Sequence, residues 1–267
     1  MAPGSTARTG RGIRGRFATV VLGTAAIAAL ALALTSPRAR AAPSPAGPPL
    51  RIGIIGTGHI GGTLATLWAK AGYELTISSR HPQQLVGLAR SLGPKGHVGT
   101  PREAATFGSV VLISVPYAAL PGIGRELRSQ LRGKIVIDTG NPYPARDGPM
   151  AVTARREGTG VASARYLPGV RLVRAFNAIS WIALARQARV HGERAAIPIA
   201  GDDPKALAVA ARLVRAAGFE PVVVGGLGRA REFDVGTPVY VKLLTASELR
   251  AALGLPKSAD SGAGAQR

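Results

Sequence analysis

The chain has 267 residues without a cysteine, which excludes disulfides, thiol nucleophiles and thiolate metal sites. Lys and Arg number 34 against 14 Asp and Glu, a formal charge of +20, yet the basic residues are scattered, aromatic residues make up 4% and no nucleic-acid-binding motif is present. We therefore interpret the charge as a solvated surface that favours anionic small molecules, with no nucleic acid as partner. The histidines show no ligand spacing, so we expect no metal site; they are His59, His81, His97 and His191.

The first 42 residues have the pattern of an export signal. Four arginines over 8–16 precede an apolar run over 17–35, and Ala39-Arg40-Ala41 supplies a small-x-small cleavage site. We predict either cleavage near Ala41 or Ala42, or retention of the run as an N-terminal membrane anchor. Both place the main domain outside the cytoplasm, in a periplasmic or extracellular location. A start of translation near Leu50 would instead leave the protein cytoplasmic.

A glycine-rich turn between a strand and a helix gives the first sign of a ligand. An apolar strand over 50–55 leads into Gly56-Thr57-Gly58-His59-Ile60-Gly61, and apolar residues three and four apart predict a helix over 60–71. In such a loop the first glycine allows the tight turn, the second lets a pyrophosphate approach the backbone, and the third lets the helix pack closely. The phosphates would bind the free N–H groups at the start of that helix, which predicts a dinucleotide site.

The end of the next strand indicates which dinucleotide binds. This strand, over 73–79, ends in Ser78, Ser79 and Arg80, where an enzyme specific for NAD carries an acid that binds the ribose 2′-hydroxyl. A carboxylate would repel a 2′-phosphate, whereas a pair of hydroxyls and a guanidinium can bond it. We therefore predict a preference for NADP; the alternative is that Arg80 is one more solvated arginine.

Strands and helices alternate along the rest of the chain. We expect strands around 98 and over 109–115, 134–138, 172–177, 195–200 and 221–224, with helices over 82–92, from 101, and over 117–131, 180–188 and 204–217. Asp202-Asp203-Pro204 is interpreted as the cap of the last helix rather than as a metal pair. The alternation implies an α/β fold, a Rossmann-type doubly wound parallel sheet with a small carboxyl-terminal α/β extension.

The predicted organisation follows from these elements. A Pro/Ser/Gly linker over 43–49 precedes the NADP-binding Rossmann domain over 50–180, the extension over 181–255 and a disordered tail over 256–267. Ligands on such sheets bind at the carboxyl ends of the strands. We therefore expect the polar strand ends to lie along one edge; they are the glycine loop, Ser79-Arg80, Ser114-Val115-Pro116, Thr139-Gly140-Asn141-Pro142 and Asn177.

The ordered motifs resemble one family over roughly 50–240. They are Gly56-Thr57-Gly58, Ser79-Arg80, Asn141-Pro142, and the runs over 173–180, 198–202 and 216–222. The chain is similar to the coenzyme F420-dependent NADP oxidoreductases and, in its second half, resembles the cytosolic NADPH domain of the six-transmembrane ferric reductases. An ordered set over this length is far more specific than the glycine loop alone.

The resemblance implies hydride transfer between NADP(H) and coenzyme F420 or a flavin, FAD or FMN, whose ring stacks on the nicotinamide. It also implies roles for individual residues. Thr57, Ser79 and Arg80 match residues that hold the 2′-phosphate and pyrophosphate. The other cofactor-binding residues expected in the loop are Gly56, Gly58, His59, Ile60 and Gly61. The ribose and nicotinamide are flanked by Ser114, Val115, Pro116, Asn141 and Pro142.

Asn177 matches a position close to hydride transfer and is the one residue assigned to catalysis, although it could equally be a strand-end residue that bonds its own turn. Tyr143, Ser180 and Trp181 border the second cofactor or serve packing. Such a transfer needs positioning without a side-chain nucleophile, which fits a chain in which no Ser-His-Asp or paired-carboxylate set can be assembled.

Two other functions are open from the sequence. A β-hydroxyacid or imino-acid reductase-like dehydrogenase shares the glycine loop and strand order, but the β-hydroxyacid enzymes usually carry a lysine on a helix that here, over 180–188, has none. A non-catalytic NADP(H)-binding redox sensor would use the same fold, because catalysis by positioning leaves no signature acid or base. The resemblance also suggests a homodimer, with carboxyl-terminal helices over 239–253 at the interface.

Overall fold

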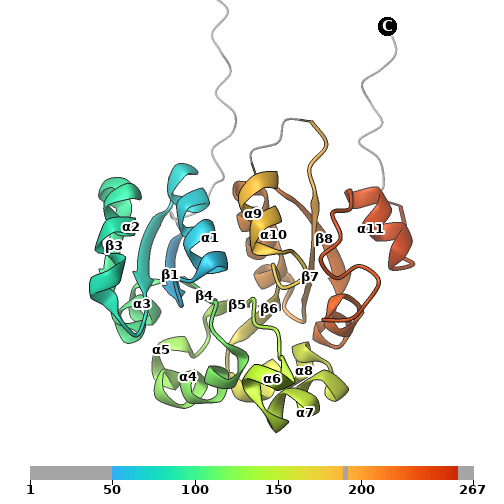
Figure 1. The fold of residues 1–267 in the computed structure, drawn as a ribbon, viewed down its shortest axis with the longest axis horizontal. Helices are drawn as coiled ribbons and strands as arrows, with labels where there is room; N and C mark the ends of the chain where they lie inside the picture. Colours follow the sequence, from blue (N-terminus) through green and yellow to red (C-terminus); the bar gives the residue numbers. More distant parts are fainter. Residues whose placement is uncertain (1–49, 189–191, 258–267) are drawn as a thin grey trace, which may run out of the picture. The chain divides into compact units, whose positions relative to one another are not determined.

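The computed structural model describes residues 50–188 and 192–257, which contain one eight-stranded sheet with helices on both faces (Figure 1). The strands are β1 Arg51–Ile55, β2 Glu74–Ser78, β3 Gly96–Gly99, β4 Val110–Ile113, β5 Ile135–Asp138, β6 Arg171–Arg174, β7 Ala196–Gly201 and β8 Glu220–Gly225. The α-helices are α1 His59–Lys70, α2 Val86–Ser91, α3 Pro101–Phe107, α4 Leu120–Glu126, α5 Arg128–Leu131, α6 Pro144–Asp147, α7 Pro149–Glu157, α8 Thr159–Tyr166, α9 Trp181–Gln187, α10 Pro204–Ala216 and α11 Ala246–Ala252. The 3-10 helices are η1 Pro82–Leu85, η2 Gly93–Lys95, η3 Tyr117–Ala119 and η4 Leu227–Phe233.

The strand order β3-β2-β1-β4-β5-β6-β7-β8 confirms the predicted Rossmann-type α/β fold. Neighbouring strands run parallel except β6 and β7, which are antiparallel. The predicted parallel sheet is therefore mostly parallel, with one antiparallel pair that the sequence did not indicate. After α9 the chain re-enters the sheet at the edge where β6 ends, so that Val173 and Arg174 pair with Gly201 and Ala200 at the end of β7.

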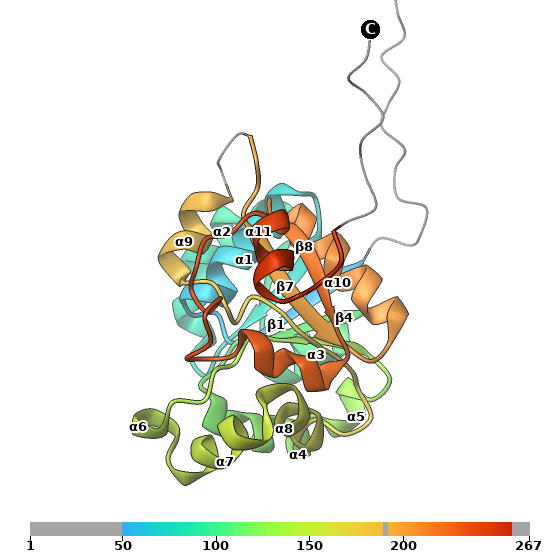
Figure 2. The same cartoon turned by 90° about the vertical axis from the view of Figure 1, so that its right-hand side faces the viewer.

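The helices divide between the two faces because strand side chains alternate in direction. Ile52 and Ile54 of β1 pack in a core with α1, α9 and α10, whereas Ile55 joins Ala104 of α3 and Leu120 of α4 in the core on the other face. Figure 2 shows α6, α7 and α8 grouped with α4 and α5 at the lower end of the molecule. Since α1 and α4 cover opposite faces, β1 and β4 form the switch point at which doubly wound sheets bind ligands.

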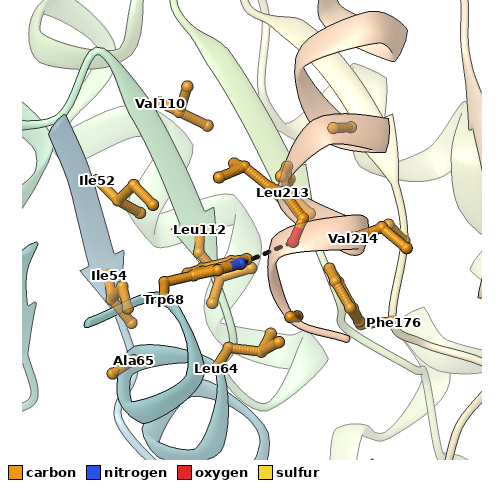
Figure 3. Close-up of a cluster of buried hydrophobic side chains, with 14 of the residues drawn as sticks. Ile52, Ile54, Leu64, Ala65, Trp68, Val110, Leu112, Phe176, Leu213 and Val214 are labelled. Carbon is orange, nitrogen blue, oxygen red and sulfur yellow. Dashed lines mark hydrogen bonds between the residues drawn. The ribbon is translucent and has the colours of Figure 1, made fainter. Parts of the chain in front are cut away.

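Trp68 connects α1, near the start of the described chain, with α10 in its second half, across the first of these cores. It is fully buried on α1, and its indole Nε1 donates a 2.8 Å hydrogen bond to the carbonyl oxygen of Leu213 in α10 (Figure 3). The ring of Phe176 meets Trp68 edge-on at a centroid distance of 6.2 Å. One side chain thereby fixes the helix after the glycine loop against a helix about 145 residues later.

Three helices between β5 and β6 were not predicted. α6, α7 and α8 are short and are separated by Gly148 and Gly158, both at positive φ. The buried residue of α6 is Asp147, and the buried faces of α7 and α8 consist of small residues rather than large apolar ones, so no hydrophobic periodicity marks these helices. The small residues are Ala151, Ala154, Thr159, Gly160, Ala162 and Ser163.

Two other predicted helices are shorter than expected. The helix predicted over 117–131 is divided into η3, α4 and α5, with Leu127 between the last two at φ −111°. Of the segment over 239–253, only α11 is helical, because Thr245 caps it and Val241 has a φ of +54°. Asp203 caps α10 by accepting a bond from the amide of Ala206, as predicted.

Some of the predicted segments are not described by the structure. The leader over 1–42, the linker over 43–49, His191 and positions 258–267 of the tail lie outside the described residues. Over residues 50–188 and 192–257, no helix is long and apolar enough to cross a membrane.

Replacing Trp68 by Phe should lower the free energy of unfolding by about 1–3 kcal/mol, because it removes buried volume and the bond to the Leu213 carbonyl. Urea denaturation followed by circular dichroism measures this difference. Trp181→Phe is the matched control: Trp181 is 47% exposed, so its replacement should change stability by less than about 0.5 kcal/mol. Equal effects of the two changes would contradict the assigned role of Trp68.

Candidate functional site

The loop over 56–61 joins β1 to α1 at the carboxyl edge of the sheet. Gly56 has a φ of +92°, and a side chain there would collide with the carbonyl oxygen of Ser114. A side chain at Gly61 would collide with the carbonyl oxygen of Gly56, so α1 starts directly against the turn. A methyl group added at Gly58 would meet nothing within 4 Å. The first and third glycines thus have the predicted steric roles, and the second leaves the backbone open to approach.

The start of α1 is free to receive an anion. The helix begins at His59 with no side-chain N-cap and no acid in its first turn. The first amides of a helix lack intrahelical partners and carry partial positive charge. The exposed ring of His59 stacks on Trp181, the first residue of α9, at a centroid distance of 4.3 Å and an interplanar angle of 17°. This stack places α9 beside the glycine loop. Ile60 is half-buried and packs against the core.

The end of β2 presents one hydroxyl and one guanidinium. Ser78 is fully buried and its hydroxyl donates to the carbonyl oxygen of Ile54 at 2.8 Å, so it does not form the expected pair of donors with Ser79. The Thr57 hydroxyl donates to the Ser78 carbonyl oxygen at 2.9 Å, which ties the glycine loop to β2. Ser79 is half-buried, and Arg80 is exposed with no hydrogen bond or ion pair among the described residues.

The turns after β4 and β5 lie along the same edge. The amide of Ser114 donates to the carbonyl oxygen of Ile55 at 2.8 Å, and the amide of Thr139 donates to that of Ile113 at 3.1 Å, so the two turns stand in register with β1. Val115 is half-buried beside Pro116, which is exposed. The structure therefore places the glycine loop, Ser79-Arg80 and Ser114-Val115-Pro116 along one edge with the turn after β5.

A buried ion pair fixes the turn after β5. Arg174, at the end of β6, is fully inaccessible to solvent, and its Nη1 lies 2.5 Å from Oδ2 of Asp138 at the end of β5. Its Nη2 donates to the carbonyl oxygen of Gly140 at 2.7 Å and lies 4.0 Å from Oδ1 of Asp234. Burial alone would lower the pKa of Arg174, but the charges of Asp138 and Asp234 raise it, so the guanidinium stays charged.

Asp147, in α6, joins the turns after β4 and β5. Its buried carboxylate accepts bonds from the amide of Tyr143 at 2.8 Å and from that of Ala118 at 3.2 Å. The guanidinium of Arg146 binds the same carboxylate at 2.7 Å and 3.0 Å and donates to the carbonyl oxygen of Asn141. Burial raises the pKa of Asp147, but these donors outweigh it and hold that pKa below the ordinary value of 3.8.

Asn177 differs from its predicted place at a strand end. β6 ends at Arg174, and Phe176 has a φ of +60°, so the chain turns away before Asn177. The residue is 2% exposed; its carbonyl oxygen accepts a 2.8 Å bond from Nδ2 of Asn141, and its own Nδ2 donates to the Phe233 carbonyl oxygen at 3.4 Å. Oδ1 of Asn177 and Oδ1 of Asn141 are both buried, and neither has a partner in the described part of the chain. The carbonyl group of Asn177 thus holds the side chain of Asn141 in place and leaves Oδ1 of Asn141 as an unused acceptor.

Aromatic side chains lie at the rim of this edge. The hydroxyls of Tyr143 and Tyr240 are 2.5 Å apart, and Asn141 Nδ2 lies 3.5 Å from the Tyr240 hydroxyl. Burial and the bond to Tyr143 raise the pKa of Tyr240, which keeps its proton. Tyr143 is 36% exposed and Trp181 is partly exposed, so both offer ring surface to a ligand, whereas the Ser180 hydroxyl caps α9 by accepting from the amide of Ala183.

Four residues of this edge were missed from the sequence. Arg174, Asp138, Asp147 and Tyr240 have partners 29 to 99 positions away or in helices that were not predicted. The available signal was the charge at the ends of two apolar strands, Asp138 and Arg174, which neighbouring parallel strands bring together. Among residues 50–188 and 192–257, no group of three His, Asp or Glu side chains is placed to hold a metal ion.

Asp147→Asn should lower the free energy of unfolding by about 1–3 kcal/mol near neutral pH, because it removes a carboxylate with charged and backbone donors. The folded-state pKa is depressed, so this stabilisation is present above about pH 4 and is lost as the pH falls through the folded pKa. Urea midpoints of the two proteins, measured from about pH 7 down to about pH 3, should converge at the acid end. The control Glu126→Gln removes an exposed carboxylate that has no ion pair among the described residues, and it should show no such convergence. A constant gap for Asp147→Asn would contradict the assignment.

Comparison with known proteins places these features in one family. Residues 51–142 match the family model for coenzyme F420-dependent NADP oxidoreductases. The chain is 31% identical over 215 residues to the F420-dependent NADP reductase of Methanothermobacter thermautotrophicus, an alignment that covers 75% of this chain and 92% of that protein. It is also 31% identical over 187 residues to metalloreductase STEAP3 of Rattus norvegicus, covering 69% of this chain but only 36% of the longer relative.

Solved structures show the same fold at lower identity. A hypothetical protein from Sinorhizobium meliloti superposes with a TM-score of 0.64 at 24% identity, over 73% of this chain and 95% of that one. An imine reductase from Myxococcus stipitatus superposes with a TM-score of 0.52 at 18% identity, over 69% of this chain and 58% of that one. With nearly the whole length of the methanogen reductase matched at 31% identity, this chain belongs to the F420-dependent NADP oxidoreductase family.

Proposed function

We propose that this protein transfers hydride between NADP(H) and coenzyme F420 by holding the two rings together at the carboxyl edge of its sheet. The observation that carries the proposal is the pairing of an uncapped α1 start with Arg80 at the end of β2, which has neither a partner nor a neighbouring carboxylate within the described part of the chain. The relative named an F420-dependent NADP reductase supports the choice of acceptor.

The residues present fit NADP at each of its charged groups. The open backbone at Gly58 and the first amides of α1 would hold the pyrophosphate. Arg80 and the hydroxyl of Ser79 would hold the 2′-phosphate, because a guanidinium forms strong bonds to phosphate and has no competing acid here. Thr57 would act indirectly, since its hydroxyl is engaged with Ser78 and shapes the loop.

The turns after β4 and β5 would receive the nicotinamide end. Asn141 offers a buried side-chain oxygen without a partner, which suits the N–H of a carboxamide. Asn177 and Arg146 fix Asn141 through its side-chain nitrogen and its carbonyl oxygen. We therefore assign Asn177 to positioning rather than to contact with the reacting atoms, because its side chain is buried.

When bound, the two cofactors supply the hydride donor and acceptor, and the chain supplies their alignment and the exclusion of water. The half-exposed rings of Trp181 and Tyr143 would border the second ring at the rim of the site. FAD and FMN have flat rings of the same kind and are the acceptors against which F420 is to be compared.

Mixing the purified protein with NADPH and oxidised F420 should cause loss of deazaflavin absorbance, faster than with FMN or FAD and faster than with NADH as donor. Gly58→Ala should raise the KM for NADPH by about tenfold or more, because the methyl group occupies the open approach without touching the fold. Gly87→Ala, at another open glycine, is the matched control. Tight NADPH binding with no turnover of any acceptor would replace the oxidoreductase proposal with a redox sensor.

Arg80→Ala should weaken NADPH binding by about 1.5–3 kcal/mol and leave NADH binding nearly unchanged, because only NADPH carries the phosphate that pairs with the guanidinium. Isothermal titration calorimetry with both nucleotides measures the two losses. Arg90→Ala, which removes an exposed arginine from α2, should affect neither nucleotide. Equal losses for NADPH and NADH would remove the basis for the 2′-phosphate site.

A further inference from the structure

A pocket of about 220 Å³ lies beside Pro142, between α7, η4 and the segment that follows η4. Its lining includes Arg155, Arg231 and Thr237. We propose that this pocket binds an anionic group, a phosphate or carboxylate, carried on the side chain of the second cofactor. The inference rests on the proposed function, because it takes the ring of that cofactor to lie at the turn after β5.

The two arginines have no acidic partner within residues 50–188 and 192–257. Nη2 of Arg155 donates to the carbonyl oxygen of Val235 at 3.4 Å, and Nη2 of Arg231 donates to that of Arg156 at 3.3 Å. Each guanidinium has five N–H donors, so most of them remain available to a ligand. Both side chains are exposed and come from different elements, α7 and η4, which meet at this pocket.

The acid in the lining does not cancel this charge. Asp234 accepts bonds from the amide of Thr159 at 2.9 Å and from its hydroxyl, and its carboxylate lies 4.0 Å from the buried Arg174. The negative charge of Asp234 is thus partly balanced by the buried guanidinium of Arg174. The two surface arginines leave the pocket with a positive balance, which favours an anion.

Thr237 adds an unused polar group to the same lining. Its hydroxyl oxygen is buried and has no hydrogen-bond partner among the residues that the structure describes. Its amide donates to the Asp234 carbonyl oxygen at 3.1 Å and fixes the residue in place. Buried hydroxyls normally have a partner. A phosphate or carboxylate oxygen would accept the hydroxyl proton of Thr237 as well as the guanidinium protons of Arg155 and Arg231.

The place of the pocket connects it to the reacting edge. Pro142 lines the pocket and also belongs to the turn after β5, next to the unused oxygen of Asn141. A ligand with a flat ring at this turn can therefore extend a charged chain toward Arg155 and Arg231. Coenzyme F420 carries a phosphodiester and carboxylates beyond its ring, whereas the tail-free deazaflavin chromophore carries neither, so the two ligands separate the pocket from the ring site.

The test compares the dissociation constants of F420 and of the tail-free chromophore, measured by fluorescence titration of the full chain in the presence of NADP⁺. In the double variant Arg155→Ala/Arg231→Ala, F420 should bind at least about tenfold more weakly, while the chromophore and NADP⁺ bind as before. The control Arg90→Ala/Arg128→Ala loses the same charge from exposed helix positions and should change none of the constants. Thermal unfolding of each variant checks that the fold is retained.

Unchanged F420 binding in the double variant, or equal weakening of F420 and the chromophore, would overturn the proposal while leaving the proposed function intact. If neither F420 nor the chromophore binds, the proposed function fails, and the binding of inorganic phosphate then tests whether the pocket is an anion site. A phosphate-dependent rise in melting temperature that survives Arg80→Ala but is lost in the double variant would support an anion site. Absence of the rise, or its persistence in the double variant, would overturn it.

Discussion

The buried contact between Arg174 and Asp138 is the interaction on which the carboxyl edge of the sheet depends. An isolated charge in a protein interior costs several kcal/mol, and removal of one partner of a buried pair typically costs about 3–5 kcal/mol. Here the guanidinium is bonded to the Asp138 carboxylate and to the carbonyl oxygens of Asp138 and Gly140, with Asp234 at 4.0 Å. The geometry is satisfied only when β5, β6 and the segment after η4 stand in one arrangement, so the pair specifies position more than it adds stability.

This arrangement determines the turn that contains Asn141. Asp138 also accepts a 2.8 Å bond from the amide of Gly140 through Oδ1, so the turn is bonded on both sides before it reaches the edge. Asn177 and Arg146 then fix Asn141. The proposed reaction between two flat rings would gain its rate from alignment rather than from an acid or a nucleophile. An edge already held in place would provide that alignment without further ordering.

The fold could be predicted from the sequence where one local pattern is sufficient. The apolar runs of β1, β4 and β5 and the glycine loop identify the doubly wound sheet because strands buried on both faces have no polar positions. Arg174 is one of 34 basic residues, and although its charge at a strand end was a signal, no local pattern pairs it with a carboxylate 36 positions earlier. The inward direction of Ser78 and the turn at Phe176 are set by tertiary contacts, and α6 to α8 bury alanine and glycine, which produce no periodic signal.

The positive charge of this chain divides into buried and exposed arginines with different roles. Arg174 is surrounded by acids and is unavailable to any ligand, whereas Arg80, Arg155 and Arg231 are exposed and have no acid beside them among the described residues. Arg80 follows β2 and Pro142 follows β5, and the order β2-β1-β4-β5 separates these strands by three spacings, about 14 Å. Unpaired guanidinium groups thus stand at both ends of an edge whose middle contains the uncapped start of α1. Each of these groups attracts a phosphate or carboxylate and none attracts a cation. Under the proposed function, charge would therefore favour the anionic ends of the two cofactors at the two ends of this edge, with the rings between them at the turns after β4 and β5.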